Sequence, residues 1–496
     1  MPDSKSSASS PSSKLALVVA VLAVMVSTAA LYWVAAHGYT LYYGDAEAHL
    51  NIARRIWDNR EPRYGEIGTV WLPLPHILML PFTWSDTLWR TGLAGAIPSA
   101  LCYIAACVLF FASLRRIFGS LFAAAAGTAV VALNPNLLYL QSAPMTEAVF
   151  FMSLAGILYA TVHERPLLAA GFTLAGTLTR YEGWFLIPAV FLYFVMRKRY
   201  AHALLYGTVA SAGPVYWLLH NWILYGNALD FYNGPWSPKA IYQRQLDGGM
   251  SPHPADGNWL QAAHYYLETA RLAVGEPLLV LGLLGACWAL WRGRRWPVWL
   301  LAMPPAFYIW SLHASGTPIF IPTLWPFSYY NSRYAIPMLP LLGLGVAAVC
   351  STPRLAIAGV LLCMAPWFTT RFGRENWICW KESQVNSENR RDWTAKGAQY
   401  LREHYRKGDG IWLNFGDLTA MLRQAGIPLQ EALHEGNELP FNRTLARPEL
   451  FLNETWIVTF AESPVAKAAS KLGYDRVATY PVQYGKPVEI YKRRPD

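Results

Sequence analysis

The feature that most constrains this chain is an uncharged run of 22 residues at positions 15–36. About 20 apolar residues in a helix span the hydrocarbon core of a bilayer, so this run predicts a transmembrane helix. It is longer than the core of a signal peptide and has no clear small-residue cleavage site, which predicts that it is retained. The Ser-rich positions 1–14 before it predict a disordered cytoplasmic tail.

Ten further apolar runs follow, and the composition, with 54% hydrophobic and 15% charged residues, is far from that of an ordinary soluble domain. The runs lie near positions 91–113, 119–135, 145–162, 166–179, 183–196, 202–224, 275–291, 297–312, 334–350 and 355–370. We therefore predict an α-helical polytopic membrane protein with about eleven transmembrane helices. The runs 166–179 and 183–196 are short for a bilayer of about 30 Å, so we expect the turn between them to be recessed below the outer surface.

Short basic loops fall between every second pair of these runs. They contain Arg115 and Arg116, Arg165, Arg197, Lys198 and Arg199, Arg292, Arg294 and Arg295, and Arg354. Basic residues collect in cytoplasmic loops, so these loops and the N-terminus are predicted to be cytoplasmic. The longer aromatic loops, including 37–90, 225–274 and 313–333, then lie on the outer face of the cell inner or plasma membrane. Much of the net charge of +10 sits in the short clusters, which favours membrane orientation over nucleic-acid binding.

The end of the chain has a different composition. Positions 371–496 hold 35 of the 72 charged residues, which predicts a water-exposed domain after the membrane domain at 15–370. Strand-like runs such as WIVTF and PVEIYKR alternate with helix-like runs, so we predict a small extracytoplasmic α/β domain. The domain has no Gly-rich phosphate loop, and the six cysteines of the chain show no metal-ligand spacing, so neither a nucleotide nor a zinc site is expected.

The first outer loop, 37–90, is dense in ionisable side chains. Such a patch directly after a membrane span is costly unless it lies at the surface or in a polar cavity, so the loop is a candidate reaction site. Apolar residues recur at helical spacing over 45–58, which predicts an interfacial helix with Asp45 and His49 on one face. The simpler interpretation is that these charges merely solvate the polar face of the helix. Because Asp45 comes right at the end of the span, we favour a functional role for Asp45 and a structural one for His49.

Other charged residues are expected on the same outer face. Arg180 and Glu182 flank the recessed turn, where the arginine either binds a phosphate bidentately or forms a structural ion pair. Arg333 is the one charge in the aromatic loop 313–334, and it either anchors to lipid headgroups or faces inward to a lipid phosphate. Glu147 opens the run at 145–162 and either stabilises a helix N-terminus or contributes to the cavity.

Four segments in this order resemble the GT-C superfamily of membrane glycosyltransferases, in particular the branch of protein O-mannosyltransferases and lipid A aminoarabinose transferases. They are GDAEAH at 44–49, WLPLPHILML at 71–80 with the span that ends in RRIFG at 115–119, NWILYGN at 221–227, and RYAIPMLP at 333–340. The resemblance covers roughly the first 370 residues by order and spacing.

The resemblance implies a sugar donor linked to polyprenyl phosphate, with the phosphate at the outer membrane boundary, and a hydroxyl acceptor in a protein, lipid or glycan. It implies Asp45 as the general base on that hydroxyl, and Arg180 and Arg333 as the groups that stabilise the phosphate leaving group. We place Glu47, Glu182 and Tyr334 in the same substrate site. No cofactor is expected, and a divalent metal is not required, because the phosphate leaving group already carries its charge.

Two other function classes stay open. A lipid or glycan transporter usually carries ionisable groups within its spans and shows inverted repeats, whereas these runs are nearly free of charge and no repeat is evident. A non-catalytic scaffold, whose α/β domain binds a partner, would tolerate the replacement of Asp45.

Overall fold

The computed structural model describes residues 11–368, 377–483 and 485–495. They form two compact units. The first, here the helical unit, comprises Met1–His37, Thr69–Pro75 and Ala96–Glu382, and the second, the loop–sheet unit, comprises Gly38–Gly68, His76–Gly95 and Ser383–Asp496. The expected disordered tail falls mostly on positions 1–10, which lie outside the described residues, and the first helix begins at Pro11.

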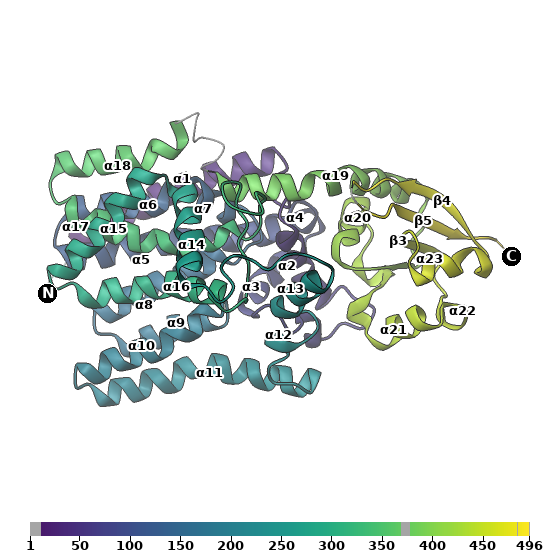
Figure 1. The fold of residues 1–496 in the computed structure, drawn as a ribbon, viewed down its shortest axis with the longest axis horizontal. Coiled ribbons are helices and arrows are strands. Elements are labelled where there is room, and N and C mark those ends of the chain that lie inside the picture. Colours follow the sequence, from purple (N-terminus) through teal and green to yellow (C-terminus); the bar gives the residue numbers. More distant parts are fainter. Residues whose placement is uncertain (1–10, 369–376, 484, 496) are drawn as a thin grey trace, which may run out of the picture. The chain divides into compact units, whose positions relative to one another are not determined.

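Each of the eleven apolar runs forms helix within the described residues, so the predicted helical membrane architecture is confirmed (Figure 1). These helices are α1 (Pro11–Ala36), α5 (Leu93–Phe118), α6 (Leu121–Ala132), α8 (Glu147–Val162), α9 (Pro166–Thr177), α10 (Glu182–Met196), α11 (Tyr200–Tyr225), α15 (Glu276–Trp291), α16 (Arg295–His313), α17 (Leu339–Val349) and α18 (Pro353–Phe368). Shorter or more polar helices complete the unit: α7 (Pro135–Gln141), α12 (Asp230–Asn233), α13 (Pro238–Asp247), α14 (Trp259–Val274) and the 3₁₀ helix η2 (Ser332–Met338).

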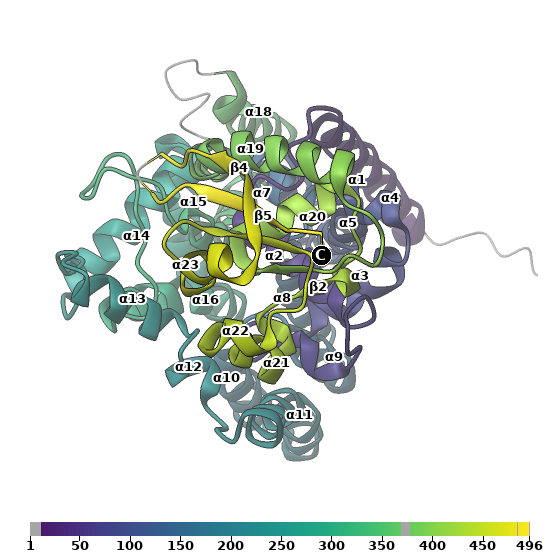
Figure 2. The same ribbon diagram turned by 90° about the vertical axis from the view of Figure 1, so that its right-hand side faces the viewer.

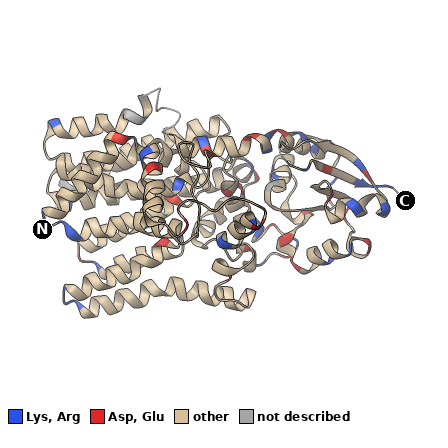
Figure 3. Ribbon diagram, in the orientation of Figure 1, with Lys and Arg blue, Asp and Glu red and all other residues tan. Residues whose placement is uncertain are grey.

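Helix length alone identifies only some of these as spans. Within the described residues, Lys14–Ala36, Leu93–Phe118 and Ser332–Val349 are each long and apolar enough to cross a bilayer. Two bent pairs bring the number to five: α6 with α7, bent by 63°, and α14 with α15, bent by 115°. Figure 3 shows how sparse charged residues are along the helices of this unit.

Glycines allow the central helix α17 to pack closely on its neighbours. A Cβ atom on Gly285 of α15 would collide with the backbone of Gly345, and one on Gly127 of α6 would collide with that of Gly343. Small residues of this kind let apolar helices approach and gain van der Waals contact where no water drives association. The packing fixes α17 and therefore the 3₁₀ helix η2 directly before it, which carries Arg333.

The loop–sheet unit contains a five-stranded sheet in the order β2-β1-β3-β5-β4. Its strands are β1 (Ile411–Leu413), β2 (Ala432–Leu433), β3 (Trp456–Phe460), β4 (Tyr474–Tyr480) and β5 (Val488–Arg493). Strand β1 is parallel to β2 and β3, whereas β5 is antiparallel to β3 and β4. Figure 2 shows the helices around the sheet, which include α19 (Ile378–His404), α20 (Thr419–Ala425), α21 (Leu439–Ala446), α22 (Pro448–Phe451) and α23 (Pro464–Ala469).

The first loop shares one hydrophobic core with this sheet. Its charged stretch forms helix α2 (Gly44–Arg55), and α3 (Leu74–Thr83) and α4 (Asp86–Thr91) follow. Leu50 of α2 and Trp89 of α4 are fully buried in the same cluster as Ile411 and Trp456 of the sheet. Each such side chain contributes about 1.5–3 kcal/mol to stability. The compact units therefore group most of the first loop with the C-terminal sheet, while the linear boundaries expected at 14 and 370 stay predictions.

Candidate active site

The helical unit contains a buried group of charged and aromatic side chains around Arg180, in the turn between α9 and α10. Its Nε donates to Glu182 at 2.5 Å, and its Nη1 donates to the Thr146 hydroxyl at 2.7 Å and to Glu147 Oε1 at 2.9 Å. Its Nη2 donates to the Tyr308 hydroxyl, which in turn donates to Glu182 Oε1 at 2.7 Å. Arg180 and Glu182 thus form an ion pair, one of the two alternatives that the sequence left open, within a larger network.

Arg333 joins this network from η2. Its Nε lies 3.3 Å from the same Glu147 Oε1 that accepts from Arg180. The ring of Tyr334 lies 5.2 Å from Cζ of Arg333 and 5.4 Å from Cζ of Arg180, and it stacks on Tyr308 with the ring centroids 4.7 Å apart. We call these seven residues the arginine cluster: Thr146, Glu147, Arg180, Glu182, Tyr308, Arg333 and Tyr334. Four of them, Arg180, Glu182, Arg333 and Tyr334, are residues that the sequence predicted for the substrate site.

Local backbone geometry holds Arg180 in place. The turn is so tight that a Cβ atom on Gly183 would lie 2.6 Å from the Gly176 carbonyl oxygen, so position 183 requires glycine. Glu182 and Glu147 are the first residues of α10 and α8, where the partial positive charge of a helix N-terminus stabilises a carboxylate. Both carboxylates thus lie between a helix N-terminus and the guanidinium group of Arg180.

A further carboxylate, which the sequence did not single out, fixes the turn before Arg333. Glu382 accepts from the Asn331 amide at 2.9 Å, from the Ser332 amide at 2.7 Å and from the Ser332 hydroxyl. Burial raises the pKa of Glu382, and the nearby charge of Arg333 acts in the opposite direction. Glu382 is at the start of α19 and lies in the stretch assigned from sequence to the C-terminal domain, so only the fold connects it with Arg333.

The arginine cluster is compact and nearly balanced in charge. Formally, Arg180 and Arg333 offset Glu147 and Glu182, yet Oε2 of Glu147 is buried without a hydrogen-bond partner among the described residues. Glu147 and Arg180 line a cavity of about 20 Å³. That space holds one water molecule but not a phosphate group. A phosphate bound here would have to contact the two arginine side chains where they are exposed, which is 11% of the Arg180 side chain and 9% of the Arg333 side chain.

The two remaining predicted residues lie on helix α2 in the loop–sheet unit. Asp45 is the second residue of α2 and is partly exposed, whereas Glu47 is buried and pairs with Arg423 at 2.7 Å. His49, one turn after Asp45, is buried with Nδ1 2.9 Å from Nε2 of His76, and its structural role stays a prediction. The convergence of Asp45 with the arginine cluster stays a prediction. Among the described residues, no three His, Cys, Asp or Glu side chains gather as a metal-ligand set.

Comparison with known proteins identifies the fold. No protein-family model matches the sequence, and no curated protein matches it either. Among solved structures, ArnT from Cupriavidus metallidurans bound to undecaprenyl phosphate is similar over 96% of this chain and 99% of its own, with a TM-score of 0.58 and 14% identity. ArnT in the apo state matches over 91% and 94%, with a TM-score of 0.52 and 13% identity.

The chain therefore shares the fold of ArnT, in agreement with the sequence segments, whose resemblance to the GT-C superfamily implied a fold of this kind. The similarity to ArnT extends over nearly the whole of both chains, so it includes the C-terminal sheet for which the sequence suggested no relative.

Proposed function

We propose that this protein is a membrane glycosyltransferase that transfers a sugar from a polyprenyl-phosphate-linked donor to a hydroxyl acceptor on the outer face of the membrane. The observation that carries the proposal is the meeting of Arg180 and Arg333 at one carboxylate oxygen of Glu147 within a GT-C fold. Two guanidinium groups held side by side suit a phosphate, which accepts charge-assisted hydrogen bonds from both. The structure of ArnT with undecaprenyl phosphate supports the same class of donor.

Each residue has a role in a single displacement at the anomeric carbon. Asp45 accepts the proton of the acceptor hydroxyl as its oxygen forms the new bond to that carbon. The bond from the carbon to the phosphate oxygen breaks, and the phosphate leaves with the electron pair. Arg180 and Arg333 stabilise the charge on this leaving group, and Tyr334 borders both.

The acidic members of the cluster hold the arginines. Glu182, together with Glu147 and Tyr308, fixes the guanidinium plane of Arg180 before the donor arrives. Such preorganisation removes the cost of orienting charged groups during the reaction. Glu182 therefore belongs to the substrate site through Arg180.

The orientation in the membrane forms part of the proposal. Arg197 and Arg199, after α10, pair with Glu164, after α8, at 2.6 and 2.7 Å. Two of the basic loops predicted to be cytoplasmic thus lie together, at the ends of α8 and α10 opposite to Glu147 and Glu182. This supports a cytoplasmic N-terminus with the arginine cluster toward the outer face, the side on which we place the acceptor.

The test is transfer by the purified protein in lipid vesicles, with a panel of radiolabelled polyprenyl-phosphate monosaccharides and hydroxyl acceptors. Asp45→Asn should lower the rate by about 10²–10⁴-fold, the usual contribution of a general base. The matched control is Glu61→Gln, which neutralises an exposed carboxylate of the same loop and should keep full activity. Wild-type rates in a folded Asp45→Asn protein would refute the role of Asp45.

The transporter alternative makes a different prediction in the same vesicles. A buried group of paired charges in a membrane unit is also typical of transport proteins. A transporter would move the labelled donor across the bilayer intact, without forming a glycosylated acceptor, and Asp45→Asn would leave that movement unchanged. Movement without transfer across the whole panel would replace the glycosyltransferase proposal with this one.

A further inference from the structure

Glu47 and Arg423 form a buried ion pair between helix α2 of the first loop and helix α20 of the C-terminal sheet region. Arg423 Nε lies 2.7 and 3.0 Å from the two carboxylate oxygens of Glu47, and Arg423 Nη1 donates to the Arg90 carbonyl at 2.6 Å. Asn51, one turn further along α2, donates to Glu47 Oε1 at 3.2 Å. The two side chains are only 9% and 8% exposed. Both charges are thus removed from water, and each is compensated by the other.

Stability alone does not account for such a pair. The cost of removing both charges from water offsets much of their attraction, and apolar residues of similar volume often stabilise a fold as well. What a buried pair adds is direction, because its hydrogen bonds form in only one relative orientation of the two helices. The Glu47–Arg423 pair therefore constrains how α2 is rotated about its own axis.

That rotation determines where Asp45 faces. Successive residues of an α-helix are about 100° apart, so Glu47 lies about 200° around α2 from Asp45. In agreement, Glu47 is buried and Asp45 is partly exposed. A helix held by Glu47 on one side presents Asp45 on the other.

A second contact on the same side of α2 reinforces this orientation. Asn51 accepts a hydrogen bond from the Trp89 indole at 3.0 Å, and Leu50 is fully buried in the core shared with the sheet. Beyond the C-terminus of α2, Asp58 accepts from the Gln430 amide at 3.0 Å. The C-terminal region thus contacts the α2 segment near both of its ends.

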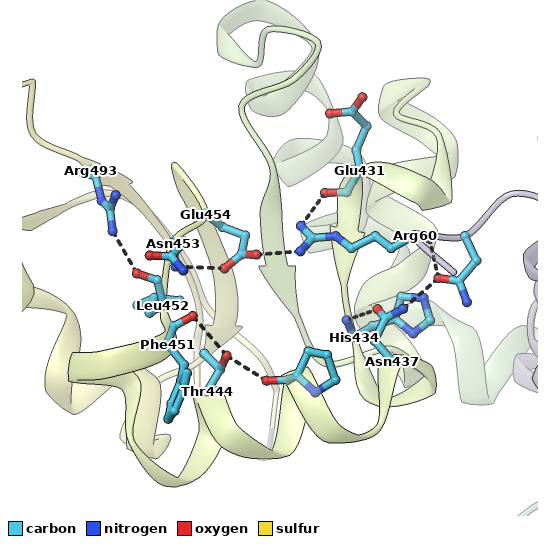
Figure 4. Close-up of polar contacts among 12 residues, drawn as sticks. Arg60, Glu431, His434, Asn437, Thr444, Phe451, Leu452, Asn453, Glu454 and Arg493 are labelled. Atoms are coloured by element: carbon cyan, nitrogen blue, oxygen red, sulfur yellow. Dashed lines mark hydrogen bonds and ion pairs between the residues drawn. The ribbon is translucent and has the colours of Figure 1, made fainter. Parts of the chain in front are cut away.

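A different ion pair between the same two regions serves as a comparison. Arg60 donates to Glu454 at 2.7 Å and to the Glu431 carbonyl at 3.3 Å (Figure 4). Its side chain is 31% exposed, and it follows the end of α2 by five residues. This pair joins the regions through residues that lie outside α2.

We infer that the C-terminal α/β region is a positioning domain for the proposed catalytic helix, and that Arg423 is the positioning residue, acting through Glu47 on Asp45. The inference rests on the proposed function for the role of Asp45. Glu47 then anchors α2, two residues from Asp45, the group that reacts. The inference also gives the C-terminal region a part in catalysis without contact with the substrate.

The test compares Arg423→Met with Arg60→Met in the full-length protein, by two measurements. Hydrogen–deuterium exchange of peptides covering 44–55 should be about tenfold faster in Arg423→Met than in the wild type, and unchanged in Arg60→Met, because Arg423 pairs with a residue of α2 and Arg60 pairs with residues outside it. In transfer assays Arg423→Met should lose about 10²-fold in kcat, the cost of a small misplacement of a reacting group, with the donor KM unchanged. Arg60→Met should retain the wild-type kcat.

Two further variants keep the inference testable if Arg423→Met misfolds. Arg423→Lys retains the positive charge but lacks the planar guanidinium group. It should therefore give an intermediate rate of hydrogen–deuterium exchange and an intermediate kcat. The exchanged pair Glu47→Arg with Arg423→Glu should recover part of the kcat lost by Glu47→Arg alone. A purely structural pair would instead lower the amount of folded protein and leave its kcat unaltered.

The outcomes separate this inference from the proposed function. Unchanged exchange over 44–55 in Arg423→Met overturns the anchoring, whatever the transfer activity. Faster exchange together with a wild-type kcat overturns the link from Arg423 to Asp45. Faster exchange in a protein whose wild type transfers no sugar from any donor supports the anchoring and overturns the proposed function instead.

Discussion

The arginine cluster of the helical unit and the Glu47–Arg423 pair of the loop–sheet unit use the same side chains in opposite ways. In the pair, one arginine faces both oxygens of one glutamate. In the cluster, two arginines meet at a single oxygen of Glu147, and the second oxygen of that carboxylate has no hydrogen-bond partner among the described residues. The pair matches one arginine with one glutamate, whereas the cluster brings two arginines to the same carboxylate oxygen, where both could contact one further anion. The arrangement, and not the type of residue, separates an anchor from a candidate binding site.

The arginine cluster and the Glu47–Arg423 pair also lie on different kinds of secondary structure. Arg180 and Arg333 are held by a turn and a 3₁₀ helix between packed apolar helices. Glu47 and Arg423 belong to regular α-helices that share a core with a sheet. We therefore expect changes in the cluster to alter both stability and donor binding, and changes in the pair to alter the mobility of α2 and kcat but not donor binding.

The largest expected effect is that of Arg180→Met. It removes four hydrogen bonds at once and leaves the carboxylates of Glu147 and Glu182 buried with less compensation, which should lower the free energy of unfolding by about 3–5 kcal/mol. Arg180→Lys should restore only part of the loss, because lysine lacks the planar fork. The measurement is the thermal unfolding midpoint of the detergent-solubilised protein, with and without added polyprenyl phosphate.

The control for this comparison is Arg197→Met, which also breaks an arginine–glutamate pair near a helix end. That side chain is 53% exposed, so the loss should stay below about 1 kcal/mol. Added polyprenyl phosphate should stabilise the wild type and Arg197→Met equally, and Arg180→Met much less. Equal stabilisation of all three proteins would mean that Arg180 does not bind the phosphate.

A smaller effect is expected for Glu382→Gln, which tests the support of Arg333. The amide nitrogen of glutamine cannot accept from the Asn331 or Ser332 amides, so at least one buried donor loses its partner. The cost should be about 1–3 kcal/mol, seen as a lower unfolding midpoint. Glu388→Gln, an exposed position of the same helix α19, should leave the midpoint unchanged. Similar midpoints for both variants would show that the carboxylate of Glu382 does not stabilise the turn.

The smallest effect concerns pH and His434 in the loop–sheet unit. Burial, together with the charges of Arg55 and Arg60, lowers the pKa of His434 to about 3. Below pH 6.5 the unfolded chain takes up a proton at this histidine and the folded one does not, so stability falls as the pH falls. The loss should be about 2 kcal/mol between pH 6.5 and pH 5, at about 1.4 kcal/mol per pH unit.

The matched variant for this prediction is His434→Asn, which keeps a side-chain acceptor for the Gly436 amide but does not titrate. Its unfolding midpoint should fall less than that of the wild type between pH 6.5 and pH 5. Glu66, whose pKa is raised by burial, has the opposite dependence, but it is present in both proteins and cancels in the comparison. The same pH dependence in both proteins would contradict a neutral, buried His434.

Much of the fold was predictable from the sequence because it depends on local patterns. The eleven apolar runs became helices, since a segment in lipid must satisfy its own backbone hydrogen bonds. The runs WIVTF and PVEIYKR became β3 and β5, and the charged stretch after the first span became α2. Strand β2, with only two residues, and helices α21 and α22 were not foreseen, because such short elements form through their tertiary neighbours.

The candidate site was predictable only in part. Arg180, Glu182 and Arg333 stood out because a charge beside an apolar run is costly, and this cost is visible in the sequence itself. Tyr308 did not stand out, because a tyrosine in an apolar helix looks like any other buried aromatic residue. Glu382 looked like one of the many charges of a water-exposed domain.

The sequence by itself determined that the chain would cross a membrane and which of its charged residues were unusual. Only the tertiary structure decided which charges would meet: Glu47 with Arg423, 376 positions apart, and Arg180 with Arg333 at Glu147. The physical reason is the separation along the chain over which each effect acts. Hydrophobic periodicity acts over a few residues of the chain, whereas a buried charge is stabilised by whichever partner the packing of distant helices brings within about 3 Å.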